Sequence, residues 1–490
     1  MLGRKTLLLN PPLVNGIAFT RQGRCQERED VLGTTKPPYT LALLAALLRE
    51  MSCEVRLIDA TAERLSIDEV CERLDRDAFV PSLIIFPSTT PTLDADVAAA
   101  ARLKARYGAP MVCFGPHAST VPALSMARAP DVDGMFVGEP EDGVLQLAAI
   151  ETPEQMTDVP SLTCRPQGAA GPVVPHRAHG TFSGFLTMPY PAWDLVALKR
   201  YALPLVDKPY VMVETSRGCP YSCDFCVAPI HQGHKFRERS ARALVDEMER
   251  TWREQGIEYF YLWGDTVTLN VKAFTAFCDE LIARKLPIQW FGNARADNLT
   301  DPAFVHRLKR AGCWMLALGV ESESDERRKD MAKRLEERKI RQAFSNMREA
   351  GIKSFAFFIF GYPGETPAAI DRTIDYAIEL DPDFANFYPA VPYPGTALHE
   401  KVTREGLLPS HADSDWAKLE YSYYVLDGNG LDHEHVMAAI NRAKRRFFLR
   451  PGYLARHAGD ITRLAATKWH VAWQIGSRML LGSKTIDARQ

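Results

Sequence analysis

Two series of short apolar runs separated by helical segments constrain this chain of 490 residues more than any other feature. The first series contains five runs with the length and composition of strands: 6–10, 54–59, 82–88, 110–115 and 134–139. Helical patterns lie between them at 39–51, 66–77 and 93–108. Strands that alternate with helices form parallel sheets covered on both faces. We therefore predict an α/β domain of Rossmann-like type over residues 1–150.

The second series predicts a barrel-like domain over residues 206–400. Its strands are predicted at 210–216, 259–265, 288–294, 314–322, 354–365 and 384–396. A complete eightfold barrel needs about 250 residues, so six strand–helix units indicate a partial (β/α)6 barrel. The proline- and glycine-rich segment 151–205 is predicted to be a linker. Residues 401–490 are predicted to be mainly helical.

Composition excludes some classes of function. The formal net charge is −2, which gives no electrostatic basis for binding nucleic acid. No run approaches the roughly 18 apolar residues of a membrane-spanning helix. The first residues have too short an apolar stretch for a signal peptide, so we expect a cytoplasmic protein. In that reducing compartment, clustered cysteines are more often metal ligands than disulfides.

Three of the ten cysteines cluster in the segment SRGCPYSCDFCV at 216–227. Cys219, Cys223 and Cys226 follow a predicted strand, at the end of the barrel where active sites lie. Closed zinc sites need a fourth ligand, and a Cys3His site that uses His231 or His234 is one alternative. The other is a 4Fe-4S cluster held by three thiolates with one iron open. The remaining cysteines are expected to be packing residues.

The segment CPYSCDFC resembles the C-x3-C-x2-C signature of radical S-adenosylmethionine (SAM) enzymes. This resemblance implies that SAM completes the coordination of the open iron. It also implies reductive cleavage of SAM to a 5′-deoxyadenosyl radical. An external one-electron donor, such as flavodoxin or ferredoxin, is then required.

The same resemblance implies SAM contacts at the ends of several barrel strands. The predicted cofactor-binding residues in this domain are Phe225, Gly264, Asp265, Arg295 and Glu321. Gly264 departs from the family pattern, which is closer to Asp-Asp at this point. The alternative for each polar residue is a strand-end cap or a salt bridge.

The first domain resembles the cobalamin-binding domain of B12-dependent radical SAM enzymes. The resemblance rests on the order of LLLNPP, KPPYTLALLAALLRE, VRLIDA, FGPHAST and VGEPED along the chain. It implies that Gly115, His117, Gly138 and Glu139 lie near cobalamin. No Asp-x-His-x-x-Gly motif is present, so base-off cobalamin without a histidine ligand is expected. A dinucleotide-binding domain lacks support because no G-x-G-x-x-G follows the first strand; a domain that has lost cobalamin stays open.

The resemblance leaves the reaction open between two classes. One is methylation of an unactivated carbon by a methyltransferase. The other is cyclisation, oxidation or rearrangement, as in the anaerobic magnesium-protoporphyrin monomethyl ester cyclase. A non-catalytic cobalamin or redox protein is a third alternative, which the intact cysteine triad disfavours.

Partners and substrate are predicted only in outline. The substrate is a small molecule, and a large apolar one fits the aromatic residues that follow the barrel. Residues 460–482 have apolar positions at helical spacing with basic residues between them. Such a helix either packs on the protein or makes a peripheral membrane contact.

Overall fold

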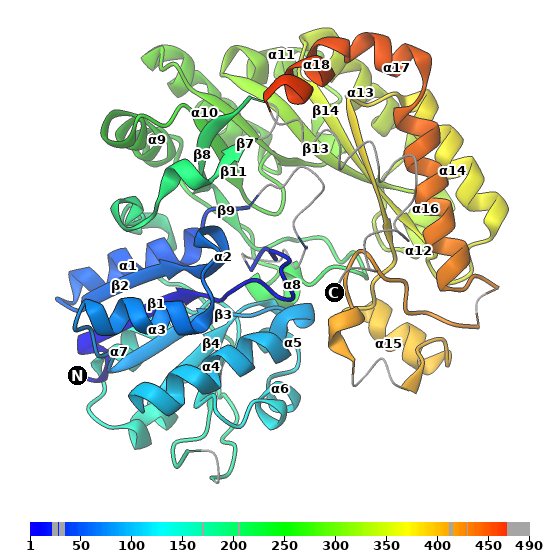
Figure 1. Cartoon of the computed structure of the whole chain (residues 1–490). Helices are drawn as coiled ribbons and strands as arrows, with labels where there is room; N and C mark the ends of the chain where they lie inside the picture. Colours follow the sequence, from blue (N-terminus) through cyan, green and yellow to red (C-terminus); the bar gives the residue numbers. More distant parts are fainter. Residues whose placement is uncertain are drawn as a thin grey trace.

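The computed structural model describes residues 1–21, 28, 35–168, 171–203, 206–410, 415–428 and 430–467. In these residues two larger sheets, of six and seven strands, stand beside each other, and a two-stranded ribbon is inserted in the chain between β8 (Lys208–Glu214) and β11 (Tyr259–Trp263) of the second sheet (Figure 1). Within the same described ranges, no helix combines the length and the apolar character needed to cross a membrane.

The first sheet has the strand order β2-β1-β3-β4-β5-β6. Its strands are β1 (Lys5–Asn10), β2 (Glu54–Asp59), β3 (Leu83–Pro87), β4 (Met111–Phe114), β5 (Gly134–Phe136) and β6 (Leu162–Cys164). The first five are parallel, and β6 pairs antiparallel with β5. The predicted parallel α/β sheet is therefore confirmed, and β6 adds an edge strand to it.

The strands of this sheet are almost entirely buried, as expected when helices cover both faces. The helices are α1 (Tyr39–Glu50), α2 (Ala60–Glu63), α3 (Ile67–Arg76), α4 (Leu93–Tyr107), α5 (Pro116–Thr120), α6 (Pro122–Arg128) and α7 (Glu141–Ala149). Helix α1 contacts α7, and α3 contacts α4. Local sequence fixes where α3 begins, because the Ser66 hydroxyl accepts a hydrogen bond from the Glu69 amide and the Glu69 carboxylate accepts one from Ser66 N.

The second sheet has the order β15-β14-β13-β12-β11-β8-β7 and does not close. Its strands are β7 (Ala202–Leu203), β8 (Lys208–Glu214), β11 (Tyr259–Trp263), β12 (Gln289–Ala294), β13 (Cys313–Glu321), β14 (Lys353–Phe360) and β15 (Phe384–Pro389). The six longer strands are parallel, which confirms the partial (β/α)6 barrel. The short β7 pairs antiparallel with β8 at one edge.

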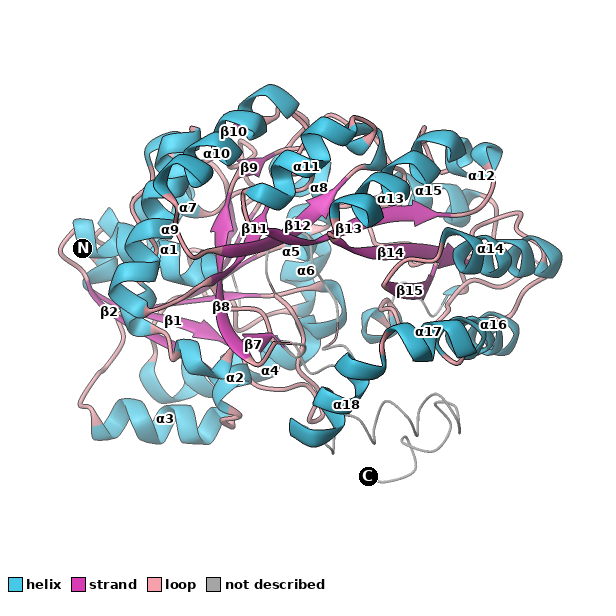
Figure 2. Ribbon diagram, turned by 90° about the horizontal axis from the view of Figure 1, so that it is seen from above, coloured by secondary structure: helices cyan, strands magenta, loops and turns pink. Residues whose placement is uncertain are grey.

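Helices line the outer side of this half-barrel (Figures 1 and 2). They are α9 (Ala241–Gln255), α10 (Val271–Arg284), α11 (Pro302–Arg310), α12 (Asp325–Asp330), α13 (Glu337–Ala350), α14 (Pro367–Leu380) and α16 (His433–Phe448). The remaining helices are α8 (Ala228–Gln232), α15 (Ala397–Arg404), α17 (Pro451–Arg456) and α18 (Ala458–Thr467). The predicted helix over 460–482 begins within α18, and the rest of it lies outside the described residues.

A two-stranded ribbon of β9 (Ser216–Arg217) and β10 (Arg237–Glu238) follows β8. Its antiparallel pairing places Arg217 opposite Arg237. The cysteine segment and α8 form the connection between the two strands. This ribbon therefore holds both ends of the connection at the carboxyl end of the half-barrel.

Candidate functional site

The cysteine loop, residues 218–227, starts with a turn that only glycine tolerates. Gly218 has φ = 81°, and a Cβ atom there would lie 2.2 Å from the carbonyl oxygen of Lys235. The Cys219 amide then donates to the Gly233 carbonyl at 3.1 Å, and the Cys226 amide donates to the Cys223 carbonyl at 3.1 Å. The loop is thus folded onto its own flanks by backbone contacts.

Asp224 anchors the same loop to the far side of the half-barrel. Its amide donates to the carbonyl of Met331 at 3.1 Å, and its carbonyl accepts from the amide of Leu398 at 2.9 Å. Its carboxylate accepts a hydrogen bond from the Tyr362 hydroxyl, beyond the end of β14. Burial raises the pKa of Asp224, and the bond from Tyr362 opposes that rise. Residues distant in the sequence therefore fix the position of the cysteines.

The three cysteines of the loop differ from the other described cysteines in exposure. Cys219, Cys223 and Cys226 are partly exposed, whereas the other six are buried: Cys53, Cys71, Cys113, Cys164, Cys278 and Cys313. Burial raises the pKa of the Cys164 thiol to about 11 and that of Cys278 to about 12. A protonated buried thiol is a packing residue and a poor metal ligand. Only the loop cysteines, among the described ones, have the accessibility that ligands need.

The structure does not support the alternative of a closed zinc site. Across the described ranges, no group of three or more His, Cys, Asp or Glu side chains could hold a metal ion. His231 is buried, and its Nδ1 lies 2.9 Å from the Ser119 hydroxyl; burial lowers its pKa to about 4. In an iron–sulfur cluster each thiolate binds a different iron. Such a cluster does not require three sulfurs to converge on one point.

Arg295, at the end of β12, packs against the cysteine loop. Its guanidinium lies 3.8 Å from the ring centroid of Tyr221, a residue that stands between the first two cysteines in the sequence. The same side chain donates to both oxygens of Asp297, at 3.1 and 3.0 Å, and to the carbonyl of Lys333 at 3.2 Å. The structure thus brings Arg295 to the cysteines. Its ion pair with Asp297 also matches the alternative to a SAM contact, namely a salt bridge, that the sequence analysis left open.

Glu321, at the end of β13, is held in an unusual backbone conformation. Its φ is +67°, in the left-handed region that non-glycine residues rarely adopt, and the pairing of β13 with β14 shifts register there. Its carboxylate accepts a bond from Lys333 Nζ at 2.6 Å. A Cβ atom on Gly319 would lie 2.2 Å from that carboxylate and 2.5 Å from Lys333 Nζ. Strain of this kind is typical of functional sites.

The other predicted SAM contacts lie around the same loop. Phe225 is partly buried and packs against the hydrophobic core. Gly264 follows β11, and a Cβ atom there would lie 2.7 Å from the Ser216 hydroxyl and 2.8 Å from that of Thr215. Glycine at 264 therefore permits close packing against the start of the cysteine segment. Asp265, the next residue, is partly exposed.

The predicted cobalamin residues lie at the carboxyl ends of β4 and β5. Gly115 has φ = +134°, and a Cβ atom there would lie 2.2 Å from the carbonyl oxygen of Ser88. Gly138 has φ = +85°, and its Cβ would lie 2.5 Å from the carbonyl oxygen of Gly180. The sequence predicts that both glycines approach a ligand. In the described residues Gly115 approaches the protein's own backbone, and Gly138 approaches the backbone and the ring of His179.

His117 is buried on α5, close to a residue that follows the half-barrel. Its Nδ1 lies 3.0 Å from the Thr90 hydroxyl, and its ring contacts Trp416 edge-on at 4.4 Å between centroids. Burial lowers the pKa of His117 to about 3, so the imidazole is neutral. Its Nε2 is buried and has no hydrogen-bond partner among the described residues.

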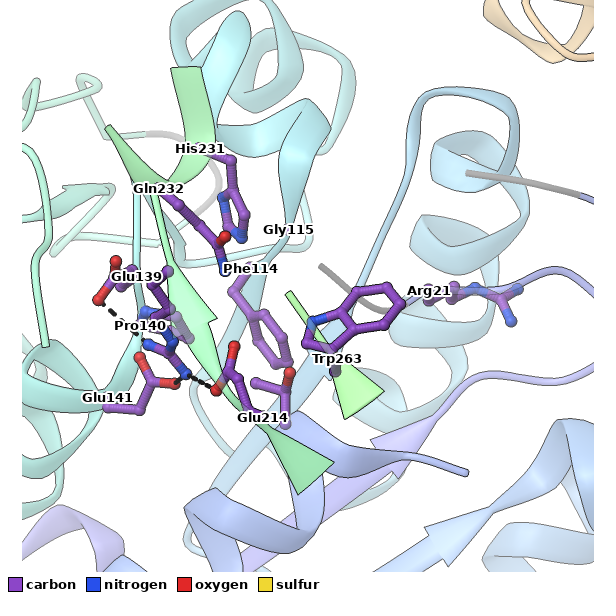
Figure 3. Close-up of a pocket in the computed structure, with 12 residues that line it drawn as sticks. Arg21, Phe114, Gly115, Glu139, Pro140, Glu141, Glu214, His231, Gln232 and Trp263 are labelled. Atoms are coloured by element: carbon purple, nitrogen blue, oxygen red, sulfur yellow. Dashed lines mark hydrogen bonds and ion pairs between the residues drawn. The ribbon is translucent and has the colours of Figure 1, made fainter. Parts of the chain in front are cut away.

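Glu139 belongs to a buried charge network between the two sheets (Figure 3). Its carboxylate accepts bonds from Arg237 and, at 3.1 Å, from Arg217. Arg217 also donates to Glu141 at 2.6 Å and to Glu214 at 2.8 Å. Two guanidinium groups thus face three carboxylates. The guanidinium groups belong to the ribbon, and the carboxylates lie at the start of α7 and at the end of β8.

Burial raises the pKa of Glu214 to about 7, and the Arg217 guanidinium opposes that rise. In contrast, the two arginines hold the pKa of Glu139 below its usual value against its burial. The network has more carboxylates than guanidinium groups, and Glu214 accommodates this excess of negative charge by its raised pKa. A carboxyl with a pKa near neutrality can exchange a proton at neutral pH.

The network lies beside a pocket that both sheets line (Figure 3). Phe114, Gly115 and Glu139 come from the first sheet, and Trp263 and His231 come from the half-barrel side. Helices α5 and α8 are in contact, and Ser119 bonds both His231 and the amide of Gly138, at 2.9 and 3.0 Å. The carboxyl ends of β4 and β5 therefore meet the segment that flanks the cysteines.

Sequence reasoning missed several residues of this site. They are Arg217, Glu214, Glu141, Lys333, Asp224 and Tyr362. Most of them are defined by partners that lie far away in the sequence, such as Glu139 for Arg217 and Tyr362 for Asp224. The one available signal is position, because Glu214 and Arg217 end the same strand segment that leads into the cysteines.

One protein-family model matches within the half-barrel. Residues 213–377 match the model of the Radical SAM superfamily. An uncharacterized methyltransferase of Pyrococcus horikoshii is 28% identical over 467 residues, covering 94% of this chain and 97% of that protein. The anaerobic magnesium-protoporphyrin IX monomethyl ester cyclase of Cereibacter sphaeroides is 24% identical, covering 86% of this chain and 68% of the cyclase.

Solved structures resemble the whole architecture. The radical S-adenosylmethionine methyltransferase TsrM of Kitasatospora setae, with cobalamin and a 4Fe-4S cluster bound, superposes with a TM-score of 0.66. It is 20% identical and covers 82% of this chain and 78% of its own. The cobalamin-dependent S-adenosylmethionine radical enzyme OxsB superposes with a TM-score of 0.69 at 16% identity, covering 97% of this chain and 72% of its own. These similarities confirm the predicted fold class, a Rossmann-like parallel sheet followed by a partial barrel.

Proposed function

We propose that this chain, whose residues 213–377 match the Radical SAM superfamily, is a cobalamin-dependent methyltransferase acting on an unactivated carbon of a small molecule. One observation carries the proposal: the carboxyl ends of β4 and β5 meet the segment that flanks the cysteine loop. Parallel sheets bind ligands at these ends. Two ligand-binding edges that face each other can place two cofactors in one site.

The residues present fit the groups that this function needs. Cys219, Cys223 and Cys226 would bind three irons of a 4Fe-4S cluster, and SAM would complete the fourth. Phe225, Gly264, Asp265, Arg295 and Glu321 would surround SAM. The edge that carries Gly115, Gly138 and Glu139 would face cobalamin, with His117 buried behind it and not bound to cobalt. When bound, these groups supply a 5′-deoxyadenosyl radical and a transferable methyl group.

The protein's own side chains position the reactants and exclude water. Asp224, Tyr362 and Arg295 fix the cysteine loop, so that the cluster would be held in one orientation. The ion pairs of Arg217 join the two sheets and close the site from that side. Glu214, with its pKa of about 7, is the described carboxyl at this junction that is able to hold or release a proton at neutral pH.

The relatives favour methyl transfer over cyclisation. The relative that covers nearly all of this chain is named a methyltransferase, and methyltransferases of bacteriochlorophyllide and of hopanoids also match. The named cyclases, at 24% and 25% identity, match less well than that first relative, although they cover more of this chain than the bacteriochlorophyllide and hopanoid enzymes do. Cyclisation or oxidation is therefore the second candidate, and product analysis separates it from the first.

The test is anaerobic turnover of the protein loaded with cluster and cobalamin, with SAM, an external one-electron donor and cell extract as the source of substrate. A methyltransferase forms both 5′-deoxyadenosine and S-adenosylhomocysteine, and transfers a labelled methyl group from SAM to a product. Formation of 5′-deoxyadenosine with no S-adenosylhomocysteine would replace methylation by the cyclase or oxidase alternative. Absence of both products from protein with a full cluster would refute the proposal.

A further inference from the structure

The two faces of the half-barrel sheet differ in exposure. On β14 and β15, partly exposed residues alternate strictly with buried ones. The buried residues face the helices: the ring of Trp290 on β12 contacts Phe274 and Phe277 on α10, and Phe387 on β15 contacts Phe447 on α16. The partly exposed residues therefore lie on the inner face, away from the helices.

Aromatic rings dominate this inner face. We use the term inner lining for the partly exposed residues Phe291, Asn293, Trp314, Phe355, Phe357, Ile359, Phe384, Asn386 and Tyr388, together with Tyr261. Strand register places them side by side, with Phe357 opposite Asn386 and Ile359 opposite Tyr388. The rings of Tyr261 and Phe291 are parallel within 2° at 4.7 Å, and Phe357 stacks with Tyr388 at 6.0 Å.

The inner lining carries no net charge among its described residues. At the amino-terminal end of β14, Lys353 donates to Asp460 of α18 at 2.8 Å, so that this cation is neutralised. The ring of His457 lies 6.0 Å from that of Phe384 and helps to close the same end. A charged ligand would find no described counter-ion along the aromatic rows, and burying it there would cost free energy.

Two amides give the lining its polar groups. Asn293 Nδ2 donates to the Tyr261 hydroxyl at 2.9 Å, and Asn386 Nδ2 donates to the Tyr388 hydroxyl at 2.7 Å. Each amide then has a carbonyl oxygen and a second N–H that no described residue occupies. In the strand register Asn293 is level with Phe355 and Phe384, and Asn386 lies one layer nearer the carboxyl ends, level with Phe357.

Ordinary barrel interiors are filled by layers of aliphatic side chains. In this open sheet aromatic rings stand where those aliphatic side chains would be. Partly exposed aromatic rows of this extent are unfavourable in water unless another group covers them. From Phe384 to Tyr388 the lining extends about 13 Å along the strand. That length accommodates several fused rings.

We propose that the inner lining binds the substrate, and that the part of the substrate buried there is a flat, uncharged ring system that carries hydrogen-bonding groups. This inference rests on the proposed function, because the lining belongs to the half-barrel whose carboxyl end carries the cysteine loop. The rings would stack on the aromatic rows, and Asn293 and Asn386 would bind polar groups of the substrate in two successive layers. A carbon at the carboxyl end of the lining would then face the cluster side of the half-barrel.

The test uses a matched pair of fluorescent probes. The first is neutral 1-pyrenemethanol and the second is pyrenetetrasulfonate, which has the same ring system and four negative charges. The holoenzyme is expected to bind the neutral probe, with energy transfer from tryptophan, and to bind the tetrasulfonate at least tenfold more weakly. Phe357→Ala should weaken binding of the neutral probe about tenfold, because one stacked ring is lost.

Two further variants separate binding from folding. Asn386→Asp keeps every ring but adds a charge to the lining, and it should also weaken neutral-probe binding at least tenfold. Tyr190→Ala removes an exposed ring outside the lining and should leave probe binding unchanged. Melting temperatures and cluster content of all variants are measured in parallel.

Equal affinity of the two probes, or equal affinity of wild type and Asn386→Asp, would overturn the inference. Failure of the neutral probe to bind the wild-type holoenzyme would do the same, because the lining would then be covered by the chain itself. Formation of 5′-deoxyadenosine by the wild-type protein is scored separately. Its absence would count against the proposed function, whereas probe binding alone decides the role of the lining.

Discussion

Replacing Arg217 with alanine should destabilise the junction between the two domains in a pH-dependent manner. Arg217 is 3% exposed and binds Glu139, Glu141 and Glu214. Removing one partner from a buried ion pair costs about 3–5 kcal/mol, because the remaining charge stays buried. Here Arg237 still pairs with Glu139, so the loss falls mainly on the other two carboxylates.

The sign of the pH effect follows from Glu214. Burial raises its pKa from 4.5 to about 7, so its contribution to stability is present below pH 4.5 and is lost as the pH rises to about 7. Without Arg217 that pKa rises further, and the loss extends to higher pH. The destabilisation caused by Arg217→Ala should therefore be about 3–5 kcal/mol near pH 8 and clearly smaller near pH 5.

Urea unfolding of both proteins at these two pH values is the assay. Arg242→Ala is the matched control, since Arg242 is 84% exposed and lies 3.8 Å from Asp246; it should change stability by less than about 0.5 kcal/mol. If Arg217→Ala costs no more than the control, the network does not hold the junction. A loss that is equal at both pH values would refute the assignment of the excess charge to Glu214.

Other substitutions test the remaining parts of the site. Cys223→Ala should abolish iron–sulfur absorption and SAM cleavage, whereas Cys113→Ala should keep both and cost about 1 kcal/mol of packing energy; cluster retention by the first variant would contradict the assignment. Tyr362→Phe leaves the loop carboxylate without its hydroxyl donor and should lower the free energy of unfolding by about 1–3 kcal/mol, which thermal unfolding can measure. Gly319→Ala places a methyl group against the neighbouring ion pair and should weaken SAM binding at least tenfold in equilibrium titrations; unchanged affinity would separate that pair from SAM. His117→Ala should leave the electron paramagnetic resonance spectrum of bound Co(II) cobalamin unchanged, and loss of a nitrogen splitting would show that this histidine binds cobalt.

Periodicity was sufficient to predict the order of the longer strands and of helices α1, α3 and α4. The runs at 54–59 and 259–265 became β2 and β11, because an apolar run between helices has few alternatives to a parallel strand. The edge strands β6 and β7 were not predicted. They have three and two residues, too few to produce a periodic pattern, and they lie in the segment assigned to the linker.

The candidate site was predictable only where one short motif carries it. The cysteine triad is such a motif, because its spacing lies within eight residues. The partners of Arg217 are Glu139 and Glu141, 78 and 76 residues away, and only the docking of two domains brings them together. Glu321 was predicted from its strand end, but its pairing with Lys333 depends on a bulge that no sequence pattern marks.

Magnetic interaction between the two metal centres tests the central claim most directly, namely that one site between the two sheets holds both cofactors. The protein is loaded with Co(II) cobalamin and with the reduced cluster, and its electron paramagnetic resonance spectrum is compared with those of the singly loaded forms. We predict that both signals are broadened or split by spin–spin coupling, because the carboxyl ends of β4 and β5 meet the segment that flanks the cysteine loop. A spectrum equal to the sum of the two separate signals would place the centres far apart and would contradict the account.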